Sequence, residues 1–107
     1  MGLIDAQFSA ASPTLYYTVT TGHRVIIDKM TATNTDSSAI TFSVYLVPAA
    51  GSQGASNAIV SSYSIAAGAT FDASVLQNHI LNSGDKVYCG ASSASKIVIR
   101  MSGRDIG

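Results

Sequence analysis

The chain has 107 residues, the size of one average domain, which is long enough to bury a hydrophobic core without disulfides or metal. Charged residues make up only 11% of it, against roughly 25% in ordinary soluble domains, and they sum to a net charge of zero. A neutral chain does not attract a polyanion, so nucleic acid is excluded as the main partner, whereas a weakly charged surface favours association with other protein subunits.

Polar and apolar residues alternate along most of the chain, which is the pattern of β-strands with one buried face. Turn residues separate the alternating segments. In chain order, the predicted strands are residues 3–8, 15–19, 24–34, 40–48, 58–65, 70–76, 86–91 and 96–101. A short irregular piece is expected at 77–81, and a loop with two glycines at 49–56.

Many short strands with no helical segment between them predict a single all-β domain, an antiparallel β-sandwich. Seven strands favour an immunoglobulin-like sandwich, and eight favour a jelly roll if residues 3–8 also pair with a sheet. We therefore expect an amino-terminal arm or edge strand over 1–13, followed by the β-sandwich domain over 14–107.

The inward positions of the alternation predict the hydrophobic core. They are Ile26, Met30, Ala32, Ile40, Phe42, Val44, Leu46, Ile59, Ile65, Phe71, Val75, Leu81, Val87, Cys89, Ile97, Ile99 and Met101. Asp28 interrupts the alternation of its strand, either because it marks a β-bulge or because it guards an exposed edge against mispairing. We favour the exposed edge.

No group of residues has the spacing of a catalytic or metal site. His23 and His79 are isolated in turn-like segments, and the six aspartates lie in six separate segments, which is typical of turn residues. Cys89 has no partner for a disulfide and is expected to be an inert core residue. The alternative, a nucleophilic Cys89 with His79 as its base, lacks any orienting motif around the cysteine. We predict that the protein is not an enzyme and needs no metal or cofactor.

The sequence contains no apolar run of the roughly 20 residues that span a bilayer, so no membrane partner is expected. Residues 1–8 have no basic segment followed by an apolar stretch, so a secretory signal is not expected either.

Two groups of side chains are candidates for contacts with other subunits. Apolar residues near the amino terminus can dock as an arm on a neighbouring subunit. Tyrosines are common in interfaces where the ring is buried and the hydroxyl group stays hydrated. The predicted interface residues are Leu3, Ile4, Phe8, Tyr16, Tyr17 and Tyr45. An alternative is a binding module that recognises a glycan or a host surface through loops such as 49–56.

Five segments, taken in order, resemble a known family. They read GHRVIIDKMTATNT at 22–35, VYLVP at 44–48, IAAGAT at 65–70, LNSGDKVY at 81–88 and VIRMSG at 98–103. This succession is similar to that of the small β-sandwich virion proteins of tailed bacteriophages, and it covers residues 14–103. The resemblance supplies no catalytic residues.

The resemblance implies a structural role in a virion. A capsid decoration or cement protein that binds the head lattice is the favoured form, and a neck, tail or fibre adaptor is the alternative. The implied partners are copies of the chain itself, in a homo-oligomer, and a major capsid or tail protein. The chain would then be made in a bacterial cytoplasm and located in the virion.

Overall fold

The structure, a computed structural model, describes all 107 residues and contains nine strands and two short 3-10 helices. The strands in the first half of the chain are β1 (Gly2–Phe8), β2 (Thr14–Thr18), β3 (Val25–Asn34) and β4 (Ile40–Val47). The second half contains η1 (Ala55–Asn57), β5 (Ala58–Ile65), β6 (Thr70–Asp72), η2 (Ser74–Leu76), β7 (Ile80–Leu81), β8 (Lys86–Ala91) and β9 (Ile97–Asp105). Neither helix has the length or the apolar character that crossing a bilayer would require.

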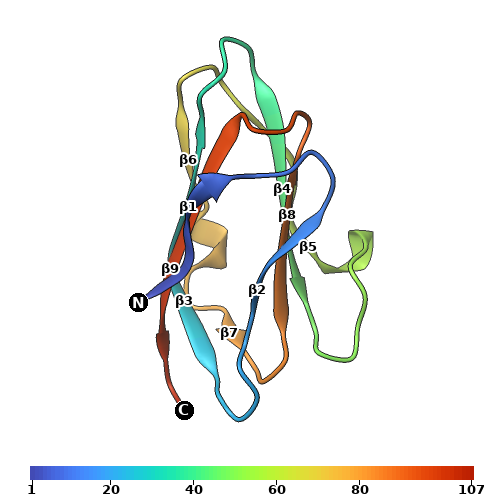
Figure 1. Ribbon diagram of the computed structural model, residues 1–107, viewed down its shortest axis with the longest axis vertical. Coiled ribbons are helices and arrows are strands. Elements are labelled where there is room, and N and C mark those ends of the chain that lie inside the picture. The colour runs from blue at the N-terminus through green and yellow to red at the C-terminus, as the bar shows by residue number, and fades with distance from the viewer.

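The strands form two antiparallel sheets that face each other (Figure 1). One sheet has the order β1-β9-β3-β6, with β7 also paired to β3, and the other has the order β2-β8-β4-β5. If the two-residue β7 is set aside, these are the two four-stranded sheets of a jelly roll, in which each sheet alternates strands from the two halves of the chain. The predicted antiparallel β-sandwich is confirmed, and the strand order selects the jelly-roll form.

Most of the predicted core is confirmed. The predicted residues that are buried between the sheets are Met30, Ala32, Ile40, Phe42, Val44, Ile65, Leu81, Val87, Cys89, Ile97, Ile99 and Met101. Leu46, Ile59 and Phe71 are partly buried and pack against this cluster. The alternation therefore identified the inner face of most strands correctly.

The predicted strand over 70–76 is too long, and the placement of Val75 in the core is wrong. The strand ends at Asp72, and the chain then forms the helical turn η2. In this turn the Leu76 N–H donates to the Ala73 carbonyl, which brings residues three apart to the same side. Ala73 and Leu76 are therefore buried, whereas Val75 is 58% exposed.

Asp28 marks a β-bulge, and its interpretation as a guard on an exposed edge is wrong. β3 is an interior strand, paired with β9 on one side and with β6 and β7 on the other. The register between β3 and β9 shifts between Ile27 and Lys29, so one extra residue sits in β3. The Asp28 carboxylate accepts a hydrogen bond of 3.0 Å from Arg104 Nε on β9.

The bulge also explains why Ile26 is not in the core. Val25 and Ile27 point inward before the bulge, and Met30 and Ala32 point inward after it. A strict alternation counted back from Met30 therefore predicts Ile26 instead of its two neighbours.

β1 is an edge strand of the sandwich and not a free arm. It pairs with β9, and a register shift between Gly2 and Ile4 turns two consecutive side chains inward. Leu3 and Ile4 are only 7% and 1% exposed. The prediction that these two residues contact a neighbouring subunit is wrong, because they fill the core of their own chain.

Each of the four sheet edges is short or irregular. The edge strands β1, β2 and β5 all contain register shifts against their partners, and the edge strand β6 has only three residues. Such edges do not offer the straight row of N–H and C=O groups that a strand from another chain needs. Addition of a strand from another chain to either sheet is therefore disfavoured.

Candidate functional site

Charged side chains are segregated between the two sheets. The strands of the β2-β8-β4-β5 sheet contain one charged residue, Lys86, at the start of β8. The strands of the other sheet contain Asp5, Asp28, Lys29, Asp72, Arg100, Arg104 and Asp105. The two outer faces of one small domain therefore differ strongly in the number of charged side chains.

We define the neutral face as the outward side of the β2-β8-β4-β5 sheet, formed by Leu15, Thr41, Ser43, Tyr45, Ser62 and Tyr88. Leu15 lies opposite Tyr88, and Tyr88 lies opposite Tyr45, so an apolar and aromatic row crosses three strands. Ser43 lies opposite Gly90 in a second row. The neutral face thus combines tyrosine rings with small hydroxyl side chains.

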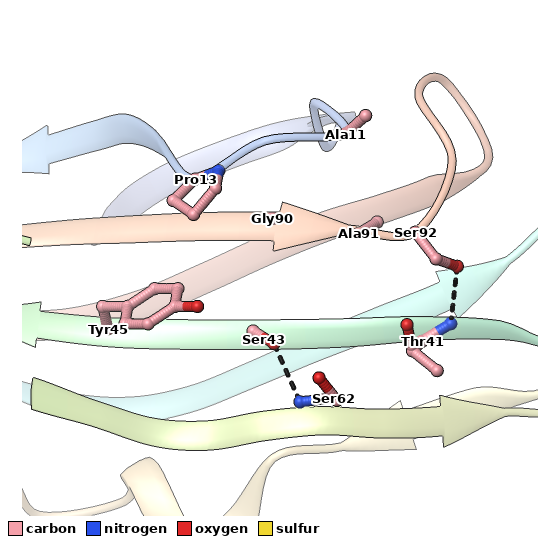
Figure 2. A pocket seen from close by; sticks show the side chains of 9 residues that line it. All are labelled: Ala11, Pro13, Thr41, Ser43, Tyr45, Ser62, Gly90, Ala91 and Ser92. Carbon is pink, nitrogen blue, oxygen red and sulfur yellow. Dashed lines mark hydrogen bonds between the residues drawn. The ribbon is translucent and has the colours of Figure 1, made fainter. Parts of the chain in front are cut away.

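A shallow groove of about 220 Å³ runs over this face (Figure 2). Thr41, Ser43 and Tyr45 line it from β4, and Ser62 lines it from β5. Its other boundary is the segment before β2, which crosses over β8 at Gly90.

Gly90 is needed where this segment crosses. A Cβ atom at position 90 would lie 3.1 Å from the Pro13 nitrogen and 3.3 Å from its Cα. Both atoms belong to the backbone and to the proline ring, so they cannot move away as a flexible side chain can. Glycine at position 90 therefore allows residues 12–13 to pack directly against the sheet. The groove is therefore shaped by backbone contacts as well as by side chains.

Two hydroxyls in the groove are used internally, and three remain free. The Ser92 hydroxyl accepts the Thr41 N–H at 3.0 Å, and the Ser43 hydroxyl accepts the Ser62 N–H at 2.8 Å (Figure 2). The side-chain hydroxyls of Thr41, Tyr45 and Ser62 have no hydrogen-bond partner within the chain. These three groups can bond to a molecule that covers the groove.

The remaining predicted interface residues lie elsewhere. Phe8 is exposed at the end of β1, whereas Tyr16 and Tyr17 pack against the core. The Tyr16 hydroxyl accepts the Ala10 N–H at 2.7 Å, which gives it a structural role. Only Tyr45 belongs to the neutral face, so the structure does not bring the predicted set together.

Sequence reasoning missed the other residues of the neutral face, which are Leu15, Thr41, Ser43, Ser62 and Tyr88. The lack of charge at outward positions of 40–47 and 88–90 was a visible signal. This signal does not reveal that β4 pairs with β8, which is about forty residues away in the sequence.

The closest pair of a basic and an acidic side chain is His23 and Asp105. His23 Nδ1 lies 2.7 Å from Asp105 Oδ2 on the surface. The Gly107 N–H and then His23 lower the pKa of Asp105 below its ordinary value, against the opposing effect of partial burial. No three His, Cys, Asp or Glu side chains gather as a metal ion would need.

Cys89 is expected to be unreactive in the folded protein. It is fully buried, and burial raises the pKa of its thiol far above the ordinary value, so almost no thiolate forms. A disulfide reagent at mildly alkaline pH should label it only after denaturant is added. Labelling of the native protein at the rate of a free thiol would contradict this burial.

A comparison of the chain with protein-family models, with curated proteins and with solved structures found no match. Function is therefore inferred from the neutral face, from the irregular sheet edges and from the distribution of charge.

Proposed function

We propose that the chain is a structural subunit of a bacteriophage virion, specifically a capsid decoration protein that binds the head lattice through its neutral face. The observation that carries this proposal is the segregation of charge, which leaves only Lys86 on the strands of one sheet. A charge buried in an interface costs several kcal/mol unless it is paired, and a face with a single charge, Lys86 at the start of β8, largely avoids that cost.

The residue types of the neutral face also suit an interface. Tyrosine is enriched and charged residues are depleted at the centres of protein interfaces. Tyr45 and Tyr88 lie side by side across two strands, and Leu15 is exposed beside them. The free hydroxyls of Thr41 and Ser62 supply hydrogen bonds around this apolar row.

The sheet edges support docking by a face. Because the edges are short or bulged, a straight strand from another subunit does not extend either sheet. The neutral face of the two-layer domain is already formed within the chain, so it can contact a lattice without rearrangement of the strands. The jelly roll is a fold of viral capsid domains, which agrees with the proposal but does not by itself assign a function.

The proposed partners are copies of the chain and a major capsid protein, and the proposed location is the virion after synthesis in the bacterial cytoplasm. A buried reduced thiol is compatible with such a compartment. The sequence resemblance of residues 14–103 to small virion proteins of tailed bacteriophages points to the same role.

Two matched threonine substitutions test the docking face. Thr41→Lys puts a charge at the neutral face, whereas Thr31→Lys puts it on the opposite sheet, where Thr31 lies between Arg100 and Asp72. Both threonines are half-buried in interior strands. Thr41→Lys should weaken binding to phage heads at least about tenfold, because an unpaired buried charge costs more than the 1.4 kcal/mol of one decade.

Binding is measured by co-sedimentation of labelled protein with purified heads of the source phage, stripped of their own copies of the chain. Thr31→Lys should bind like the unmodified protein. Equal binding by both variants would contradict the assignment of the neutral face as the docking face. Absence of the unmodified protein from the heads would contradict the decoration role. Recovery with purified tails would instead favour the tail-adaptor alternative.

A further inference from the structure

The outward side of the β1-β9-β3-β6 sheet, which we call the charged face, carries two cations on neighbouring interior strands. Lys29 on β3 lies opposite Ser102 on β9, and Thr31 lies opposite Arg100 in the next outward pair. The methionine pair between these two pairs is completely buried, so all four side chains point outward. Two cations and two hydroxyls therefore lie together at the middle of one outer surface.

These four side chains have almost no partners within the chain. The Arg100 guanidinium forms no ion pair or hydrogen bond, and the hydroxyls of Thr31 and Ser102 form no hydrogen bond either. Lys29 has only a contact of 3.9 Å with Asp72, which is too long for a hydrogen bond. The N–H and O–H donors at the centre of the charged face are therefore free to bind another molecule.

Two aspartates flank the cations, one on each edge strand of the sheet. Asp72 on β6 lies opposite Thr31. Asp5 on β1 lies beside Ser102, because its Oδ1 would be 3.1 Å from a Cβ built on Gly2, and Gly2 is opposite Ser102. The charged face is therefore positive at its centre and negative on both sides.

Apolar side chains border this centre along the direction of the strands. At one end, Phe8 lies opposite Val98, which points outward between two buried isoleucines. At the other end, Ile80 lies opposite Ile26, which also points outward. Phe8 and Ile80 are each 51% exposed. Exposed apolar and aromatic groups around an arginine are typical of protein interfaces.

We propose that the charged face binds a segment of a partner protein in which an aspartate or glutamate is flanked by apolar residues. Arg100 offers two parallel N–H donors to the carboxylate, and Lys29, Thr31 and Ser102 offer further donors around it. The apolar residues of the segment pack on the apolar side chains at the two ends of the face. Because the charged and neutral faces lie on opposite sheets, one subunit can hold two partners at once.

The arrangement of charges selects this occupant over two others. A nucleic acid or an anionic membrane presents many phosphates, which would meet Asp5 and Asp72 as well as the cations, and the chain as a whole has no net positive charge. A purely apolar partner would bury Arg100 and Lys29 without a counter-charge. A single carboxylate contacts the positive centre alone.

Two blocked tripeptides, acetyl-Leu-Glu-Leu-amide and acetyl-Leu-Gln-Leu-amide, test the site by titration of the ¹⁵N-labelled protein in NMR. The Glu peptide should shift the Arg100 Nε–H signal and the amide signals of residues 29–31 and 100–102, with a dissociation constant below roughly 10 mM. The Gln peptide should bind at least fivefold more weakly, and methyl phosphate should also bind more weakly than the Glu peptide. Absence of these shifts, equal binding of both peptides, or tighter binding of methyl phosphate overturns the proposal.

Three variants locate the binding. Arg100→Gln should lower the affinity for the Glu peptide at least fivefold, whereas Arg24→Gln, which removes an exposed arginine before β3, should leave it unchanged. Asp72→Asn should raise the affinity at least twofold, because it removes the carboxylate that competes for Lys29. Circular dichroism and the unfolding midpoint verify that each variant is folded. An Arg100→Gln protein that binds as before, or an Asp72→Asn protein that does not bind more tightly, contradicts the assignment.

Failure of this site and failure of the neutral face are distinguishable. Arg100→Gln should still bind phage heads, and Thr41→Lys should still bind the Glu peptide, because the two substitutions lie on opposite sheets. Loss of peptide binding in folded Thr41→Lys would place the peptide on the neutral face and overturn the assignment of the charged face.

Discussion

Replacing Gly103 by alanine is expected to lower the free energy of unfolding by about 3 kcal/mol or more. Gly103 is buried on β9 and lies opposite Ile27, directly beside the bulge of β3. A Cβ atom at this position would collide with the Ile26 carbonyl oxygen and would lie 2.8 Å from Leu3 Cδ1. Because the carbonyl belongs to the backbone of a paired strand, the sheet itself must shift, and such overpacking is costly.

Gly54→Ala is the matched control for this substitution. Nothing lies within 4 Å of a Cβ built on Gly54, and its φ of −174° is ordinary extended backbone. Its unfolding midpoint in urea, followed by circular dichroism, should stay within experimental error of the unmodified protein. A Gly103→Ala protein as stable as the Gly54→Ala control would show that β3 and β9 do not approach as closely as described.

Replacing Asn34 by alanine is expected to cost about 3 kcal/mol. The side chain is completely buried, and all its hydrogen-bonding groups are used. Its Nδ2 donates to the Ser38 carbonyl at 2.8 Å and to the Ile65 carbonyl at 2.9 Å, and its Oδ1 accepts the Asp36 N–H at 2.9 Å. Alanine would leave these three backbone groups without their hydrogen-bond partner. One of them, the Ile65 carbonyl, lies in the other sheet.

Asn57→Ala provides the comparison for Asn34→Ala. Asn57 also bonds through both ends of its amide, to the Ser52 carbonyl and the Gly54 N–H, but it lies at the end of the short surface helix η1, where water replaces the lost bonds. Its loss should cost less than about 1 kcal/mol in the same urea titration. Equal effects of the two substitutions would mean that the amide of Asn34 does not join the sheets.

The period of two in the sequence was sufficient to predict the strands and most of the core, because it reports directly which side chains face inward. It failed wherever one residue is added to a strand. The bulge near Asp28 moved the buried positions to Val25 and Ile27, and the bulge in β1 turned both Leu3 and Ile4 inward. Such insertions depend on the partner strand, which a single alternating segment does not specify.

The candidate sites were harder to predict than the fold. Tyr45 was identified because tyrosine is an interface residue in general, but Tyr88 became its neighbour only through the pairing of β4 with β8. Lys29 and Arg100 are far apart in sequence, and they meet because β3 pairs with β9. The neighbours Tyr45 and Tyr88, and likewise Lys29 and Arg100, are brought together by the order and pairing of the strands, which local sequence patterns do not reveal.

The irregular borders of the two sheets have a consequence for the concentration at which the chain can accumulate. A capsid subunit, the role proposed for this chain, is needed in many copies. Crowded β-rich chains that expose straight strands tend to convert into fibrils. Here the kinks of β1, β2 and β5 and the shortness of β6 deprive a growing fibril of a template. The folded chain can therefore reach a high concentration without pairing edge to edge into fibrils.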